Sequence, residues 1–214
     1  MKIAKNIGHT VTILSFDPGT ANLGYAAIVG NAQTSEVRVG NYFGVFKTNK
    51  WLDGSEVAVR ERIDALGTDV STLIKDVKPT FIAMEDFVEQ GKRVGKTYKE
   101  MSYLTEHLRL VCRSLGYEVV IYANGIWKRK TLKATNASKI QVQHYIKHTV
   151  QDTEKILKSP DHVWDSVGIG YCRWLDYLSK VRGNDHGTEN TSTSSVSIPN
   201  GPRRLPKRTR VPTS

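Results

Sequence analysis

The spacing of apolar residues changes along the chain, and each spacing predicts a different kind of element. Short apolar runs at VTILSF, GYAAIVG and EVRVGNYFGVFKT, separated by turn residues, predict three strands in an antiparallel meander. From Val59 to Val77 apolar residues recur every three or four positions, which predicts an amphipathic helix that ends at Lys78-Pro79. The front of the chain therefore predicts a sheet followed by a helix that packs on it.

Strands and helices alternate in the next part of the chain. PTFIAME and YEVVIY predict two buried strands, with a helix between them whose apolar positions run from Met101 to Leu115. Two helices complete the pattern, one opening near Ala137 and one over KSPDHVWDSVGIGYCRWL. Because crossover connections are right-handed, TFIAM and EVVIY should lie parallel to VTILSF. We expect an α/β domain with a mixed five-stranded sheet, three antiparallel strands and then two parallel ones, flanked by helices.

The length of 214 residues suits one domain with an appendage. We assign residues 1–182 to the domain. Residues 183–214 are rich in Gly, Ser, Thr, Asn and Pro and are expected to form a disordered basic tail, because they can bury little apolar surface. Its RRLPKRTR segment suits either a phosphate-tracking tail or an inert solvated end.

The charge balance points to a polyanionic partner. The chain carries 31 Lys and Arg against 21 Asp and Glu, a net charge of +10 with a pI near 9.6. The tail contributes +5 − 2 = +3, so the domain keeps +7 by itself. Nucleic acid is the commonest such partner, although net charge also serves solubility.

Other features favour a soluble, cytoplasmic protein. No apolar run approaches the roughly 20 residues of a membrane span, and the N-terminus lacks the apolar stretch of a signal peptide. Cys112 and Cys172 lie within helical apolar patterns, where they are expected to pack as small hydrophobes. We therefore expect no contact with a membrane.

Two carboxylates directly follow predicted strands. Asp17 follows VTILSF and Glu85 follows FIAM, so both should project from the edge formed by the carboxyl ends of parallel strands. Asp17 alone, in DPG, is better explained by a turn. Glu85 ends an apolar strand, where an acid needs a partner or a bound cation. Basic residues that follow it offer a salt bridge instead: Lys92, Arg93, Lys96 and Lys99.

The last predicted helix begins with an unusual polar cluster. Ser159 suits the N-cap and Pro160 the first turn, and Asp161 and His162 fit a first turn without any further role. Capping does not explain Asp165. At 100° per residue, Asp161, His162 and Asp165 share one stripe beside the apolar face, where they can point at the sheet.

Four of these side chains can meet: Asp17, Glu85, Asp165 and either His162 or Asp161. Several carboxylates cannot stay ionised together without a cation. Oxygen ligands with one imidazole favour Mg²⁺, or Mn²⁺ as a substitute, over zinc. Two such ions about 4 Å apart are the usual arrangement for phosphodiester hydrolysis. Together with the basic domain, this predicts a nuclease.

Four segments, in this order, resemble RuvC-type Holliday-junction resolvases of the RNase H-like nuclease superfamily, most closely the phage or viral members. They are ILSFDPGTANLGYA, FIAMED, NASKIQVQHYI and HVWDSVGIGY, and the resemblance covers roughly residues 11–180. DPGT alone is also typical of actin-like ATPases, but those use two related domains, and this chain is too short for them. The resemblance implies an RNase H-like fold.

The resemblance also implies roles for individual residues. Asp17, Glu85 and Asp165 occupy metal-ligand positions, and His162 occupies the fourth. Asp161 departs from the simplest pattern of the family and leaves the fourth ligand open. His162 ranks first because its spacing of three from Asp165 matches the motif.

Further residues fall at the family's DNA-contacting positions. Lys128 and Lys139 match basic residues near the scissile phosphate, although each also suits an ordinary solvated lysine. Phe87 matches an aromatic residue that stacks at the junction crossover, but its offset from Glu85 is one residue shorter, which also suits a core position. Together with Lys92, Arg93 and Lys96 these are the expected DNA contacts.

The resemblance implies a Mg²⁺-dependent endonuclease that resolves four-way junctions as a homodimer, because two symmetric nicks need two sites. Two alternatives remain open at this stage. One is an RNase H-like nuclease that cuts other branched DNA, flaps or hybrids. The other is a non-catalytic junction-binding protein, which the complete set of acids argues against.

Overall fold

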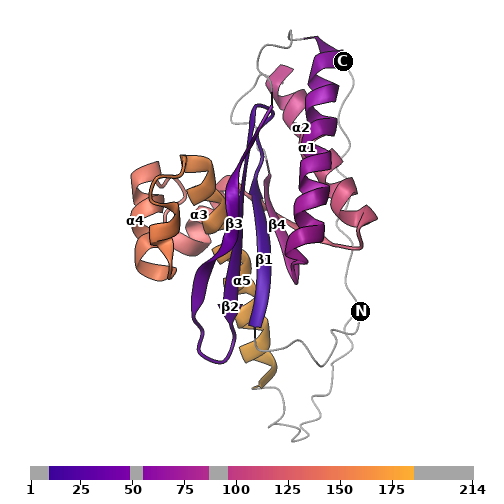
Figure 1. The fold of residues 1–214 in the computed structure, drawn as a ribbon. Helices are drawn as coiled ribbons and strands as arrows, with labels where there is room; N and C mark the ends of the chain where they lie inside the picture. The colour runs from indigo at the N-terminus through magenta and orange to yellow at the C-terminus, as the bar shows by residue number, and fades with distance from the viewer. Residues whose placement is uncertain (1–9, 49–54, 87–95, 186–214) are drawn as a thin grey trace, which may run out of the picture.

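A five-stranded mixed sheet forms the centre of the molecule (Figure 1). The structure, a computed structural model, describes residues 10–48, 55–86 and 96–185. The strands lie in the order β3-β2-β1-β4-β5, with β1, β2 and β3 antiparallel and β4 and β5 parallel to β1. Their bounds are β1 Thr10–Asp17, β2 Asn22–Asn31, β3 Val37–Lys47, β4 Phe81–Asp86 and β5 Val119–Ala123. The expected fold class is confirmed.

Helices cover both faces of the sheet (Figure 1). One face carries α1 and α2, and the other carries α3, α4 and α5. The helices are α1 Glu56–Val77, α2 Lys96–Ser114, α3 Asn124–Leu132, α4 Lys139–Thr149 and α5 Asp161–Asp185, with a 3₁₀ turn at Thr153–Ile156. Among the described residues, none of these helices is long and apolar enough to cross a membrane.

The prediction of only two helices after the last strand was wrong. Helix α3 follows β5 without a loop and begins at Asn124. The apolar pattern misses it because the helix is short and buries few residues. Trp127 and Thr131, one turn apart, are its fully covered side chains, and Ile126 is exposed. Such a short contact gives no helical periodicity of the kind that marks a longer helix.

Helix α5 differs slightly from expectation at both ends. It begins at Asp161, one residue after Pro160, whose carbonyl accepts a 3.0 Å hydrogen bond from the Val163 amide. It continues through Asp185, past the domain boundary expected at residue 182. The predicted disordered tail from residue 186 onward lies outside the described residues.

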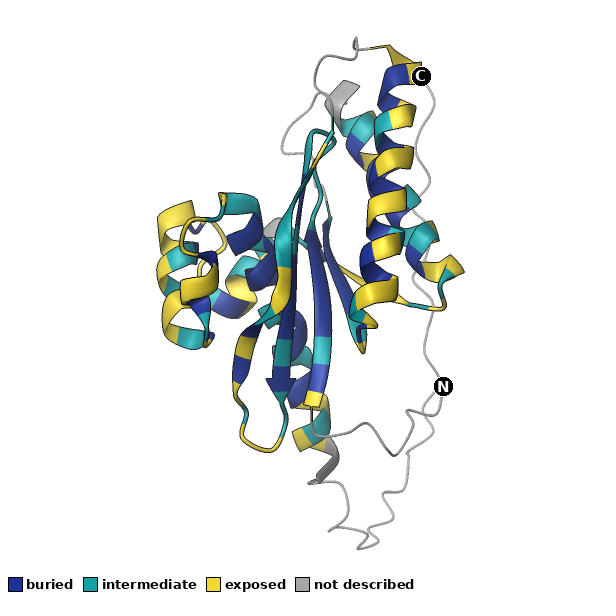
Figure 2. Cartoon of the chain, in the orientation of Figure 1, coloured by how far each residue is buried: buried dark blue, intermediate teal, exposed yellow. Residues whose placement is uncertain are grey.

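Side-chain alternation divides the core into two layers, which Figure 2 shows as buried residues on both sides of the sheet. In β1, Leu14 and Phe16 pack towards α1 and α2, whereas Ile13 packs towards α5. In β4, Met84 faces α1 and α2 and Ala83 faces α5. Since side chains alternate with a period of two, Asp17 of β1 and Glu85 of β4 turn their side chains towards α5.

Helix α5 lies unusually close to the sheet near its first turn. Ser15 of β1 is fully buried and donates a 2.7 Å hydrogen bond to the Ser166 carbonyl of α5. Gly24 of β2 pairs with Asp17, and a Cβ placed on Gly24 would lie 2.4 Å from the His162 carbonyl oxygen. A glycine is needed at this position because the helix backbone occupies the space of a side chain.

Gly24→Ala tests this close approach. The added methyl has to push the start of α5 away from β2, so we expect a loss of roughly 1–3 kcal/mol in the free energy of unfolding. Gly183→Ala is the matched control, because nothing lies within 4 Å of a Cβ there and alanine favours a helix. Denaturant titration of both variants measures the effect, and equal stabilities would contradict the packing described.

Candidate functional site

Two acids meet where β1 and β4 end. The parallel register pairs Phe16 with Met84, so the next residues, Asp17 and Glu85, lie side by side on adjacent strands. Both side chains belong to the face that α5 covers, as alternation requires. Asp17 has a side chain 13% exposed and Glu85 is 9% exposed, so water screens their charges poorly. The predicted meeting of these two acids at one sheet edge is confirmed.

Helix α5 brings two further groups to the same edge. His162 Nδ1 lies 2.6 Å from Asp17 Oδ2, joining the first turn of α5 to the end of β1. This hydrogen bond is the main reason why the pKa of His162 is raised. Asp165, one turn further along, is partly buried and close enough for its charge to act on Glu85.

The carboxyl groups destabilise one another's charged forms. Burial, followed by the charges of Asp17 and Asp165, raises the pKa of Glu85 to about 8. Burial, followed by the charge of Asp17, raises the pKa of Asp165 to about 6. Three acids held this close need a positive partner in order to ionise together near neutral pH.

Two lysines supply part of that positive charge. Lys128 of α3 lowers the pKa of Asp165, opposing the effect of burial. Lys139 is the first residue of α4, where Ser138 and Gln141 form a capping box that sets the helix start. Its charge also acts on Asp165, although its side chain is 70% exposed. Both lysines predicted from the sequence therefore lie near the acids.

Asp161 has a different set of contacts from its neighbour His162. Its two carboxylate oxygens accept hydrogen bonds from Lys139 Nζ at 2.7 Å and from Gln143 Nε2 at 3.0 Å. Both donors belong to α4, so Asp161 connects α5 to α4 rather than to the sheet. It thereby holds the ammonium group of Lys139 beside the acids.

The donor set suits a hard divalent cation. It consists of one imidazole and three carboxyl groups, two of which have raised pKa values. In the arrangement described, no three His, Cys, Asp or Glu side chains of residues 10–48, 55–86 and 96–185 are already placed to hold a metal ion. The Asp17 carboxylate is engaged by His162 instead. A cation at this edge would have to compete with that hydrogen bond.

Sequence reasoning missed three residues that shape the site. Ser15 ties β1 to α5, and Gly24 admits the first turn of α5. Trp127 of α3 is 0% exposed, and its indole N–H lowers the pKa of Glu85. Serine in a strand and tryptophan in a short helix carry no chemical signature by themselves.

Several predicted DNA contacts cannot be placed. Phe87, Lys92 and Arg93 lie outside the described residues. Lys96 is the first residue of α2, but its side chain is not among those described. The stacking role of Phe87 and the DNA contacts of this basic segment therefore stay predictions from the sequence.

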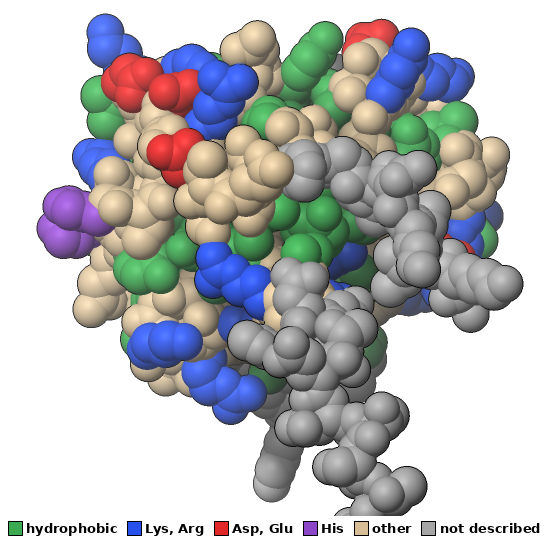
Figure 3. Space-filling view, turned by 90° about the horizontal axis from the view of Figure 1, so that it is seen from below, with side chains coloured by type: hydrophobic (Ala, Val, Ile, Leu, Met, Phe, Trp, Pro, Cys, Tyr) green, Lys and Arg blue, Asp and Glu red, His purple; other side chains and the backbone are tan. Residues whose placement is uncertain are grey.

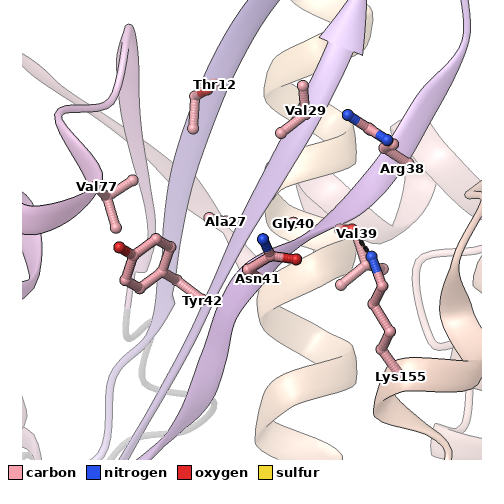
Figure 4. Close-up of a pocket in the computed structure, with 10 residues that line it drawn as sticks. All are labelled: Thr12, Ala27, Val29, Arg38, Val39, Gly40, Asn41, Tyr42, Val77 and Lys155. Atoms are coloured by element: carbon pink, nitrogen blue, oxygen red, sulfur yellow. Dashed lines mark hydrogen bonds between the residues drawn. The ribbon is translucent and has the colours of Figure 1, made fainter.

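The opposite end of the molecule has a different character. A hollow of about 260 Å³ lies beside β3 near Thr12, Arg38 and Tyr42, where Lys155 donates a 3.3 Å hydrogen bond to the Val39 carbonyl (Figure 4). No predicted site residue lines it. Viewed from below, visible Lys and Arg side chains at this end are scattered among neutral, apolar and acidic ones (Figure 3).

Comparison with solved structures identifies the fold. Thermus thermophilus RuvC is 16% identical, with a TM-score of 0.60 over 80% of this chain and 96% of that one. The same protein in complex with a Holliday junction substrate gives a TM-score of 0.61 at 15% identity over the same shares of both chains. The yeast mitochondrial Holliday junction resolvase gives 0.59 at 18% identity, covering 86% of each chain. At identities this low, the structural similarity shows a common fold and nothing further.

Family membership rests on a separate comparison of sequences. No curated protein matches the chain. The model of the family described as crossover junction endodeoxyribonuclease RuvC matches residues 13–173, which contain the three acids, the histidine and both lysines of the site. The match spans most of the chain and ends within α5, beyond Asp165. The protein belongs to the RuvC family of crossover junction endodeoxyribonucleases.

Proposed function

We propose that this protein is a Mg²⁺-dependent endonuclease that resolves four-way DNA junctions. The observation that carries the proposal is the meeting of Asp17, Glu85 and Asp165 at one sheet edge, where burial and mutual repulsion raise the pKa of Glu85 and of Asp165. A divalent cation relieves this repulsion, and phosphodiester hydrolysis is the chemistry that such a site supports. Membership of the RuvC family is the second support.

Asp17, Glu85, Asp165 and His162 are the residues that would hold the cations. Two Mg²⁺ ions, replaceable by Mn²⁺, would polarise the scissile phosphate and stabilise the leaving 3′-oxygen. The chain's own contribution is to keep the carboxylates fixed and poorly hydrated, so that they favour a cation over water. His162 would give up its hydrogen bond to Asp17 Oδ2 in order to offer Nδ1 to a cation.

Lys128 and Lys139 would counter the charge that develops on the phosphate. Lys139 begins α4 and is exposed, so its ammonium group can leave Asp161 for a phosphate oxygen without losing a buried contact. Lys128 extends from α3, the helix that also carries Trp127. Ammonium groups that are already in position before the reaction stabilise the developing negative charge with little reorganisation.

His162 is favoured over Asp161 as the fourth ligand because of their neighbours. His162 contacts Asp17 directly, whereas both oxygens of Asp161 are taken by Lys139 and Gln143. We assign Asp161 the role of holding Lys139. This assignment leaves the set of three carboxylates and one imidazole expected from the sequence.

A homodimer fits the proposed substrate, since two symmetric nicks need two sites related by a two-fold axis. Tyr103 and Leu110 are apolar residues of α2 that are 47% and 53% exposed, and they offer a surface for a second copy. Phe87, Lys92, Arg93 and Lys96 remain our proposed contacts with the junction beyond the metal site. Cutting of flaps or hybrids is the main alternative activity.

Cleavage of a synthetic four-way junction tests the proposal. With Mg²⁺ we expect paired nicks at symmetric positions, and with EDTA we expect binding without cleavage. Asp17→Asn should reduce the cleavage rate about a thousandfold, which corresponds to several kcal/mol of transition-state stabilisation. Flap and RNA–DNA hybrid substrates are the controls. Preferred cutting of either one, or full activity in EDTA, would reject junction resolution by this site.

Paired substitutions decide the fourth ligand. His162→Asn should raise the Mg²⁺ concentration needed for half-maximal cleavage by about tenfold or more, because a ligand is lost. Asp161→Asn removes only an exposed ion pair, worth roughly 0–1 kcal/mol, so cleavage should fall less than about fivefold. The reverse ranking would make Asp161 the ligand. Metal titration of the cleavage rate measures both effects.

Glu85→Gln should stabilise the metal-free protein. In the folded chain the pKa of Glu85 is about 8 against an ordinary 4.5, so the native state holds a proton that the unfolded state releases between these values. Wild-type stability should therefore fall as pH rises from about 5 to 8. At pH 8 in EDTA the variant should gain on the order of 2 kcal/mol, and at pH 5 nearly nothing.

Adding Mg²⁺ should reverse this order, because only the wild type gains from binding the cation. Glu118→Gln, at an exposed position, is the matched control and should change stability at neither pH. Thermal denaturation at pH 5 and pH 8, with EDTA or Mg²⁺, gives the comparison. A variant less stable than the wild type in EDTA at pH 8 would contradict the repulsion described for this site.

A further inference from the structure

Trp127 carries a buried polar group without an ordinary partner. The side chain is 0% exposed, and its Nε1 reaches no acceptor at hydrogen-bond geometry within the described residues. Leaving such a donor unsatisfied costs roughly 1–3 kcal/mol. Phenylalanine would fill a similar volume in the core without this cost. The indole N–H therefore calls for a reason beyond packing.

The ring is held between α5 and the sheet. Its six-membered ring lies against Gly168 of α5, where an added Cβ would come within 2.6 Å of the Trp127 Cζ3 atom. Gly168 follows Asp165 by less than one turn. Because Nε1 is on the five-membered ring, away from Cζ3, the N–H edge is turned away from Gly168.

Glu85 is the group on that side of the ring. Trp127 packs in the same core layer as Ala83, and Glu85 is two residues further along the same face of β4. The indole N–H also lowers the pKa of Glu85, against the larger effects of burial and of Asp17. The donor thus lies close to the carboxyl group but not yet in good hydrogen-bond geometry with it.

The backbone of α3 holds the indole in this place. Thr131 Oγ1 donates a 2.8 Å hydrogen bond to the Trp127 carbonyl inside the helix. Lys130 pairs with Asp176 of α5, which also accepts a hydrogen bond from the Tyr122 hydroxyl of β5. Lys128, the residue after Trp127, places its ammonium group 5.4 Å from the indole centroid. One short helix therefore presents an N–H to Glu85 and a positive charge to Asp165.

We propose that Trp127 is a positioning residue of the metal site: its indole N–H holds one oxygen of Glu85 and so directs the carboxylate towards a cation shared with Asp17 and Asp165. This inference rests on the proposed metal site. A partner that orients a metal ligand typically changes metal affinity by 10–100-fold. The N–H then has an acceptor when Glu85 is ionised and the cation is bound.

Trp127→Phe removes the N–H and keeps most of the ring volume. Titration of the DNA-free protein with Mg²⁺ or Mn²⁺, followed by calorimetry, should show affinity reduced about tenfold or more. Junction cleavage should need correspondingly more Mg²⁺, with the rate at saturating Mg²⁺ within a few fold of wild type. Trp174→Phe is the matched control, because Trp174 is equally buried in α5 and packs against Gly30.

The outcomes separate this inference from the proposed function. If the wild type binds no divalent metal, or if Asp17→Asn binds it equally well, the metal site itself is wrong. If the wild type binds metal, Asp17→Asn does not and Trp127→Phe binds as the wild type does, only the role of Trp127 is rejected. Equal losses in Trp127→Phe and Trp174→Phe would also reject it, since both would then reflect packing.

A second measurement does not depend on how Trp127→Phe folds. The chain has four tryptophans, so ¹⁵N-labelled protein gives four indole N–H signals. Addition of Mg²⁺ to the wild type should move one of them downfield, as a hydrogen bond to a carboxylate forms. In Glu85→Gln the same addition should leave it in place. The proposal would be overturned if no indole N–H signal moved on addition of Mg²⁺, or if the same signal moved equally in Glu85→Gln.

Discussion

Repulsion between carboxylates at the shared end of β1 and β4 is the constraint on which the site depends. Parallel pairing sets Asp17 beside Glu85, and burial denies both of them the screening of water. The pKa of Glu85 rises to about 8 as a result. A fold maintains this arrangement at the expense of its own stability, which is common where a protein must bind a cation or react. The rest of the domain supports these side chains.

That support comes from one face of the sheet. Helix α5 approaches β2 closely enough to exclude any side chain at Gly24, and Ser15 joins β1 to the helix backbone. These contacts carry His162 and Asp165 to the sheet edge. Helices α3 and α4 then add Lys128 and Lys139 around the rim. The acids lie at the centre and the two lysines lie outside them. This arrangement suits a metal ion between the carboxylates and a phosphate group beyond it.

The acid cluster lies at an edge of the sheet, which suits an extended substrate. A small ligand needs a cavity that surrounds it, such as the hollow beside β3. A DNA backbone is long and charged and needs an accessible edge bearing cations. Lys139 is mostly exposed, and Asp161 holds it at the border of the acid cluster. The proposed site is therefore at the end of the strands, and no residue of it lines that hollow.

Local periodicity and the rule for parallel strands predicted the strand directions, the two acids at strand ends and the stripe that contains Asp165. The sequence also placed Lys128 and Lys139 through family resemblance. Only the tertiary structure decided that Asp161 bonds Lys139 and Gln143 while His162 bonds Asp17. The neighbours of these two adjacent residues depend on where α4 and β1 lie around α5. Helix α3, Ser15, Gly24 and Trp127 likewise gain their roles from contacts between distant segments, which no local pattern records.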